Sequence, residues 1–256
     1  MGILNVTPDS FSDGGQFAEP SVAISHAHHM VADGADIIDI GAESTRPYGG
    51  AQPVSYIDEV SRLSPVVGAV VGLGRPCSID TLKAQTAAWA LDQGVSILND
   101  VWGLQGDPDM AKLAARRGTP VVCMHNRRSV DPDIDIVADV LTFFGRTLEI
   151  AGQAGIAREQ IVLDPGIGFG KTPEQSIACI AHFAEFKTFG LPLLLGSSRK
   201  RFIASVAPSE PGDRIGGSLA SMLHGVRHGA DIVRVHDVAE TVQALRVDAA
   251  LQGQRS

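Results

Sequence analysis

The sequence predicts a single α/β domain, the (β/α)8 or TIM barrel, over residues 1–256. Eight short apolar runs follow one another along the chain, and each ends on a polar or charged residue. A stretch with helical periodicity follows each run. The run ends are about 33 residues apart on average, close to the roughly 31 expected when about 250 residues are shared among eight strand–helix units. The pattern has no interruption, so we expect no linker and no second domain.

The eight predicted strands are rich in Ile, Val and Leu on both faces, as in a parallel sheet covered by helices. In chain order they span residues 2–5, 36–41, 77–80, 96–100, 120–125, 161–164, 192–196 and 231–236. Between them, apolar residues recur at helical spacing; Ala23, Ala27, Met30 and Val31 share one face of the first predicted helix. In such a barrel the chemistry lies at the C-terminal ends of the strands, so the polar run ends are the candidate site residues.

Composition and charge exclude several classes of protein. The formal net charge is −8, which disfavours binding to nucleic acid or to an anionic membrane. Three cysteines, Cys77, Cys123 and Cys179, show no metal-binding spacing, and we expect them to be buried thiols in a reducing cytoplasm. No apolar run approaches the ~18 residues of a membrane helix. We expect neither a signal peptide nor a membrane partner.

A first group of polar residues follows the first, second and eighth strands, which are neighbours in a closed barrel. Its members are Asn5, Thr45, Arg46, Arg234 and His236. Two guanidinium groups, an imidazole, a hydroxyl and an amide together suit a phosphate or pyrophosphate. The alternative is that Arg46 and Arg234 form surface ion pairs with Glu43 or Asp237.

A second group ends the third, fourth, sixth and seventh strands, and we expect it on the opposite flank of the barrel mouth. Its members are Asp80, Asn99, Asp164 and Lys200. A carboxylate accepts two parallel hydrogen bonds from a guanidine-like edge, and an amide satisfies a mixed donor–acceptor edge. This set therefore suits a flat polar ring. The alternative is that Asp80 and Asp164 form salt bridges with Lys200 or Lys171.

Residues 164–172, DPGIGFGKT, resemble a nucleotide-binding loop but match neither the phosphate-binding-loop pattern nor the dinucleotide-binding fingerprint. Pro165 stands where a phosphate-binding loop needs its first glycine, and Lys171 stands where a dinucleotide fingerprint needs its third. We expect a glycine-rich turn that lets backbone approach a ligand. His125, at the end of the fifth strand, either contacts a ligand or has a structural role.

Seven motifs carry a resemblance to a known family. In chain order they are GILNVTPDSFSDGG, GAESTRP, SIDT, ILND, LDPGIGFGKT, SSRKRF and RVHD. They resemble the successive signatures of the dihydropteroate synthases, the pterin-binding barrels of folate biosynthesis and targets of sulfonamides. The resemblance implies condensation of 6-hydroxymethyl-7,8-dihydropterin pyrophosphate with 4-aminobenzoate, giving 7,8-dihydropteroate and pyrophosphate. It also implies Mg²⁺ as cofactor and a homodimer.

The resemblance also implies residue roles. Asn5 binds Mg²⁺ near the pyrophosphate, and Thr45 and Arg46 contact the phosphate and border the aminobenzoate. The pterin is held by Asp80, Asn99, Asp164 and Lys200, with Arg234 stacked over the ring. Arg234 and His236 bind the leaving phosphates. The aminobenzoate pocket is shaped by Phe11, Thr45, Pro47 and Arg201, although the family more often has Ser at the last position. The groups expected to act in catalysis are Arg46, Lys200, Arg234 and His236.

Two other functions are compatible with a pterin-binding barrel. A corrinoid-type methyltransferase would share the ring-binding carboxylates, but it has no use for the anion-binding group. A catalytically silent pterin-binding protein would need neither the magnesium residue nor the phosphate residues, which this sequence retains.

Overall fold

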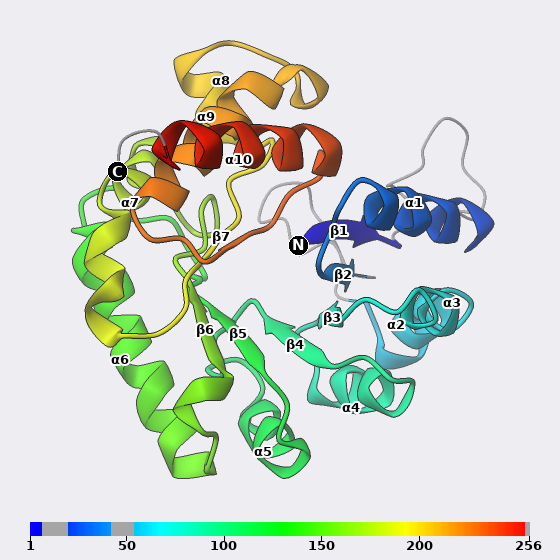
Figure 1. The fold of residues 1–256 in the computed structure, drawn as a ribbon. Helices are drawn as coiled ribbons and strands as arrows, with labels where there is room; N and C mark the ends of the chain where they lie inside the picture. The colour runs from blue at the N-terminus through cyan, green and yellow to red at the C-terminus, as the bar shows by residue number, and fades with distance from the viewer. Residues whose placement is uncertain (7–19, 42–53, 254–256) are drawn as a thin grey trace.

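The computed structural model of the protein describes residues 1–6, 20–41 and 54–253. Within these ranges, parallel strands lie at the centre and helices surround them (Figure 1). The strands are β1 (Gly2–Asn5), β2 (Ile38–Gly41), β3 (Cys77–Asp80), β4 (Ile97–Asp100), β5 (Val121–Met124), β6 (Ile161–Asp164), β7 (Leu194–Leu195) and β8 (Ile232–Val233). Each predicted run thus contains a strand, and several are shorter than predicted.

Helices follow the strands in the predicted alternation. They are α1 (Pro20–Ala32), α2 (Tyr56–Leu63), α3 (Val67–Val71), α4 (Ala84–Asp92), α5 (Pro108–Arg117), α6 (Ile136–Ala154), α7 (Pro173–Ala181), α8 (Arg201–Val206), α9 (Ile215–Arg227) and α10 (Val238–Gly253). Among the described residues, three short 3₁₀ helices, Arg158–Gln160, Phe183–Phe189 and Pro211–Asp213, lie in the connections. Local sequence fixes several starts: in α7, Thr172 and Gln175 form a capping box and Pro173 occupies the first turn.

The eight strands form a closed ring. Strands β1 to β6 pair in sequence order as one parallel sheet, and β7 pairs with β8. Single bridges join these two sheets, between Leu163 and Leu193 on one side and between Gly2 and Val235 on the other. The second consists of two hydrogen bonds, from Val235 N to the Met1 carbonyl and from Ile3 N to the Val235 carbonyl, each 3.0 Å long. The barrel prediction is therefore confirmed, although the last two strands are shorter than predicted because their ends pair only through these bridges.

The main core lies between the strands and the helices. Ala23, Ala27 and Met30 of α1 are buried, as their spacing predicts. Beneath α6, the Phe144 and Phe186 rings pack edge to face with centroids 6.0 Å apart. The three cysteines are buried thiols without disulfides, in agreement with the sequence. This packing makes the strand ends a rigid platform for the site.

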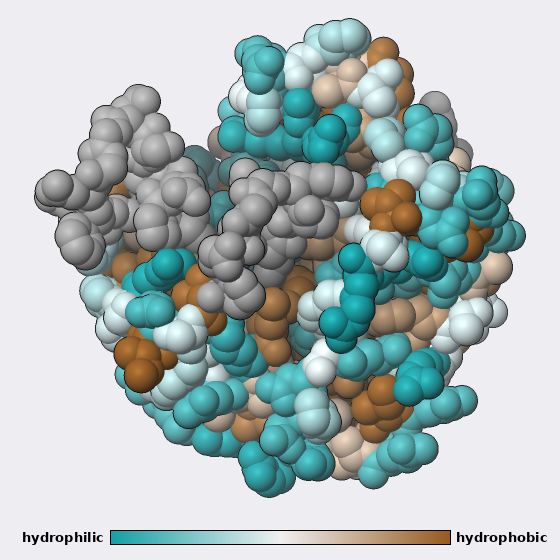
Figure 2. All heavy atoms as spheres, turned by 180° about the vertical axis from the view of Figure 1, so that it is seen from behind, coloured by the Kyte–Doolittle hydropathy of each residue, from teal (hydrophilic) through white to brown (hydrophobic). Residues whose placement is uncertain are grey.

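The described part of the face turned away from the viewer in Figure 1 carries little continuous apolar surface. Figure 2 shows the face opposite to that of Figure 1, and on its described part hydrophilic residues predominate while hydrophobic residues occur in separate positions. Among the described helices, none has the length and apolar character that crossing a bilayer requires.

Candidate active site

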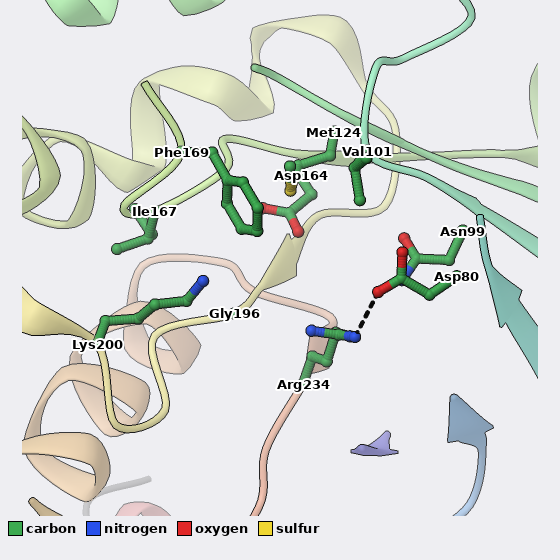
Figure 3. A pocket seen from close by; sticks show the side chains of 10 residues that line it. All are labelled: Asp80, Asn99, Val101, Met124, Asp164, Ile167, Phe169, Gly196, Lys200 and Arg234. Carbon is green, nitrogen blue, oxygen red and sulfur yellow. Dashed lines mark hydrogen bonds and ion pairs between the residues drawn. The ribbon is translucent and has the colours of Figure 1, made fainter. Parts of the chain in front are cut away.

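The candidate site is a pocket at the C-terminal ends of the strands. Strand register places the residues of its floor side by side, because Gly41 pairs with Asp80 and Asp80 with Asn99 across β2, β3 and β4. The pocket is lined by Asp80, Asn99, Val101, Met124, Asp164, Ile167, Phe169, Gly196, Lys200 and Arg234 (Figure 3). The structure thus brings together all four residues predicted to bind a flat polar ring, and Arg234 with them.

Arg234 lies between two buried carboxylates. Its Nε donates to Oδ2 of Asp39 at 2.6 Å, and its NH2 donates to Oδ2 of Asp80 at 2.8 Å. The expectation that acids and cations occupy opposite flanks is wrong for this residue. A buried carboxylate lowers its desolvation cost by pairing with a cation, and Arg234 is the cation within reach. The alternative pairing of Arg234 with Asp237 does not occur either, since Asp237 pairs with Arg199.

Asp39 is a site residue that the sequence interpretation missed. Its side chain is fully buried, and besides Arg234 it accepts hydrogen bonds from Ser78 Oγ at 2.5 Å and Asn99 Nδ2 at 3.1 Å. One carboxylate therefore orients both an amide and a guanidinium of the pocket. A signal was available, because Asp39 interrupts an apolar strand between Ile38 and Ile40, where an ionised side chain needs a partner.

We expect Asp39→Asn to weaken binding of a pterin and to lower the free energy of unfolding by about 2 kcal/mol, the size of a hydrogen bond to a charged group. The amide can turn its NH2 toward the Ser78 hydroxyl, so the shape is kept and the charge beside Arg234 is lost. Titration calorimetry and urea unfolding measure the two effects. Asp36→Asn, on the exposed approach to β2, is the matched control. An unchanged pterin affinity would show that Asp39 does not orient the pocket.

Asp164 and Lys200 complete the walls of the pocket. Oδ1 of Asp164 accepts from the amide of Gly166 at 2.7 Å, which leaves acceptor sites of the carboxylate directed into the pocket (Figure 3). The Lys200 ammonium lies 4.1 Å from the centre of the Phe169 ring, a cation–π contact. Phe169, like Val101 and Ile167, lines the pocket although the sequence interpretation did not single it out.

The electrostatics of the pocket favour a ligand with an edge that is positively charged or rich in hydrogen-bond donors. Burial raises the pKa of Asp80, although the nearby Arg234 opposes the shift. Burial also raises the pKa of Asp164, opposed by the Gly166 amide and by Lys200. In addition, Oδ1 of Asp80 is buried with no hydrogen-bond partner among the described residues. A donor edge in the pocket would satisfy this oxygen and stabilise both carboxylates.

His236 lies beside the pocket on the loop after β8. Its Nδ1 is 3.0 Å from the Ser198 hydroxyl, and its backbone amide donates to the same oxygen at 3.2 Å. Burial lowers the pKa of His236 to about 3, with further lowering by Arg199 and Arg234. The imidazole is therefore neutral near pH 7 and can offer an anion a hydrogen bond without a charge.

Two further predicted residues, Asn5 and Arg201, are not among those that line this pocket. Asn5 is half-buried at the end of β1, and Arg201 is exposed at the start of α8. Phe11, Thr45, Arg46 and Pro47 lie outside the described residues. Across the ranges 1–6, 20–41 and 54–253 no group of three or more His, Cys, Asp or Glu side chains is arranged to hold a metal ion.

The glycine-rich run forms the expected turn between β6 and α7. Gly166, Gly168 and Gly170 have positive φ angles of 65°, 80° and 57°. A Cβ on Gly166 would lie 1.9 Å from the carbonyl oxygen of His125, so the turn packs directly against the end of β5. His125 is fully buried and contacts Lys171 and Asp139, which establishes a structural role. Lys171 thus does not pair with Asp80, whose partner is Arg234.

Comparison with known proteins identifies the family. The family model described as "Pterin binding enzyme" matches residues 1–236. The dihydropteroate synthase of Bacillus subtilis (strain 168) is 47% identical over 253 residues, covering 98% of this chain and 88% of that protein. The chain belongs to the dihydropteroate synthase family of pterin-binding enzymes.

Solved structures of the dihydropteroate synthase family share the whole architecture. The Xanthomonas albilineans dihydropteroate synthase with 4-aminobenzoic acid superposes with a TM-score of 0.93 at 40% identity, covering 98% of this chain and 92% of that one. The same enzyme in complex with 7,8-dihydropteroate gives a TM-score of 0.90 at 38% identity, with the same coverage.

Proposed function

We propose that the chain is a dihydropteroate synthase, which condenses 6-hydroxymethyl-7,8-dihydropterin pyrophosphate with 4-aminobenzoate to give 7,8-dihydropteroate and pyrophosphate. The observation that carries the proposal is the pocket lined by two carboxylates, an amide, a lysine and an arginine at the mouth of the barrel. A pterin has a guanidine-like edge for a carboxylate, a flat face for a guanidinium, and a tail that carries the pyrophosphate. The family of the chain supports the same substrates.

In the proposed reaction the bond between the exocyclic methylene carbon and the pyrophosphate oxygen breaks first, and the electron pair leaves with pyrophosphate. The resulting cation is delocalised into the electron-rich dihydropterin, where Asp80 and Asp164 favour positive charge. The nitrogen of 4-aminobenzoate then bonds to the methylene carbon and loses a proton to solvent. An arylamine is a neutral nucleophile, so the site needs no strong base.

We assign stabilisation of the departing pyrophosphate to Arg234 and His236, with Arg46 as a further expected contact. Guanidinium groups match the oxyanion geometry, and the neutral His236 offers a hydrogen bond. This assignment requires Arg234 to exchange part of its pairing with Asp80 for substrate. The donor edge of the pterin would then occupy the carboxylate that Arg234 gives up.

We propose Mg²⁺ as the cofactor, with Asn5 as its protein ligand. The amide oxygen of Asn5 is a hard donor, and Mg²⁺ commonly uses one or two protein ligands together with substrate phosphates. When bound, the ion would neutralise charge on the pyrophosphate.

The proposal also covers the oligomeric state of the protein and its location in the cell. We propose a homodimer, as the family resemblance implies, and light scattering of the purified protein measures the mass directly. We also propose a cytoplasmic location, supported by three buried cysteines without disulfides, which suit a reducing compartment.

A pyrophosphate-release assay tests the proposal by omission. Release is expected only when the pterin pyrophosphate, 4-aminobenzoate and Mg²⁺ are all present, and chelation of the metal should abolish it. Release without the arylamine would indicate a hydrolase. Calorimetric binding of a pterin without any turnover would indicate a silent binding protein.

A further inference from the structure

The turn between β6 and α7 is held by a buried lysine that the proposed reaction does not use. Lys171 is 1% exposed. Its ammonium nitrogen donates to the carbonyl oxygens of Gly166 at 2.9 Å and Phe169 at 3.2 Å, and lies 2.7 Å from Nδ1 of His125. An ammonium carries three donors, and these three acceptors surround it. Lys171 therefore links two carbonyls of the turn to one ring nitrogen at the end of β5.

A second set of contacts fixes the histidine. Nε2 of His125 lies 3.0 Å from Oδ2 of Asp139 on α6, and Arg127 donates to the same oxygen at 2.8 Å. Burial lowers the pKa of His125 to about 4, so the ring is neutral near pH 7. Because Nδ1 accepts from Lys171, the proton is on Nε2 and is donated to Asp139. The contacts thus run from α6 through β5 to the turn.

The turn itself forms one wall of the pterin pocket. Ile167 and Phe169 line it, and the Phe169 ring holds the Lys200 ammonium (Figure 3). The amide of Gly166 orients Asp164. A displacement of the turn would therefore move one carboxylate, one aromatic face and, through that face, one cation of the site.

We propose that Lys171 is a positioning residue for the pterin half of the substrate. Its ammonium group sets the shape of residues 164–170 and so places Asp164, Phe169 and Lys200 around the ring. The inference rests on the proposed function, because it specifies which half of the substrate the turn serves. Lys171 itself lies behind the turn and is not among the residues that line the pocket.

Lys171→Met tests the proposal, because methionine has a similar length and no donor. The calorimetric Kd for a free hydroxymethylpterin is expected to rise about tenfold to hundredfold, the scale of a small misplacement of binding groups. The KM for the arylamine substrate is expected to stay within about twofold, since uniform damage would raise both constants. Lys171→Gln keeps an N–H donor, so its pterin Kd should lie between those of the wild type and Lys171→Met. Lys112→Met, which removes a surface lysine paired with Asp109, is the matched control.

The pH dependence gives an independent readout. Lys171 is faced by His125 at the end of β5, Arg127 on the following loop, Asp139 on α6, Asp164 on β6 and Cys179 on α7. Burial lowers the pKa of Lys171 to about 8. The ammonium therefore loses its proton as the pH rises through that value, and the contacts of Lys171 with the turn and with His125 weaken in the wild type. The ratio of variant Kd to wild-type Kd should shrink between about pH 7 and about pH 9.

Circular dichroism and thermal unfolding report whether Lys171→Met folds. If it does not, Asp139→Asn reaches the same contacts from a side chain that is 34% exposed, and a smaller rise in the pterin Kd is expected. A folded Lys171→Met with the wild-type pterin Kd, or with equal rises in both substrate constants, would overturn the inference. A wild-type protein that binds the pterin but releases no pyrophosphate would overturn the proposed function alone.

Discussion

Replacing Arg234 with alanine should lower kcat/KM for pyrophosphate release by about 1000-fold, the upper range for removing one preorganised donor from a developing anion. The same change should destabilise the fold by about 3–5 kcal/mol, because it leaves two buried carboxylates without their cation. In the wild type, Arg234 donates to Asp39 and to Asp80 at hydrogen-bond distance. Steady-state kinetics and urea unfolding measure the two losses.

The stability loss of Arg234→Ala has a defined pH dependence. Burial already raises the pKa of Asp80 against the opposing effect of Arg234, so removing the arginine raises it further. A carboxyl whose folded pKa lies above its unfolded pKa destabilises the folded state at high pH and is relieved as the pH falls. The deficit relative to wild type should therefore be smaller at about pH 5.5 than at about pH 8.

Arg117→Ala is the matched control, since its partner Asp92 is exposed and such pairs contribute little. A variant of Arg234 that retains more than about a tenth of the wild-type kcat/KM would rule out its role at the pyrophosphate.

Asp164→Asn should raise the Kd for a pterin by about 100-fold, which corresponds to about 2.7 kcal/mol and to the loss of charged hydrogen bonds. The asparagine oxygen can still accept from the Gly166 amide, so its NH2 faces the pocket and opposes the donor edge of the ring. Burial raises the pKa of Asp164, which means that the ionised carboxylate is costly in the empty site. The amide should therefore leave the melting temperature unchanged or higher.

Calorimetry and thermal unfolding separate these two outcomes for Asp164→Asn. Asp92→Asn, at the exposed end of α4, controls for the loss of an acidic side chain. Parallel losses of affinity and melting temperature would mean that Asp164 supports the fold and does not serve the ligand.

Much of the fold and of the pocket follows from the sequence. Apolar runs that alternate with helical stretches predict the barrel. The polar residues at the ends of these runs predict that Asp80, Asn99, Asp164 and Lys200 lie together at one mouth of the barrel. These predictions work because strand direction and register fix which residues meet. They depend on the backbone more than on any particular side-chain conformation.

Pairings inside the barrel could not be predicted in the same way. Asp39 lies two residues before the end of β2, and its partners come from strands far apart in the sequence. Alternation along one strand does not reveal which neighbours fill the space between strands. The expectation that Arg234 lies on the flank opposite the acids failed for the same reason, since the choice of its carboxylate partners depends on interior geometry. For His125 the sequence is compatible with two roles, and its contacts with Lys171 and Asp139 distinguish between them.

The two single bridges that close the barrel divide it into unequal parts. The arc from β1 to β6 carries the acidic residues and Asn99 on a continuous ladder, whereas Lys200 and Arg234 follow the short β7–β8 pair. The cationic wall therefore meets the acidic wall along two short seams. A substrate that contacts both walls would add contacts across those seams and so stabilise the closed ring.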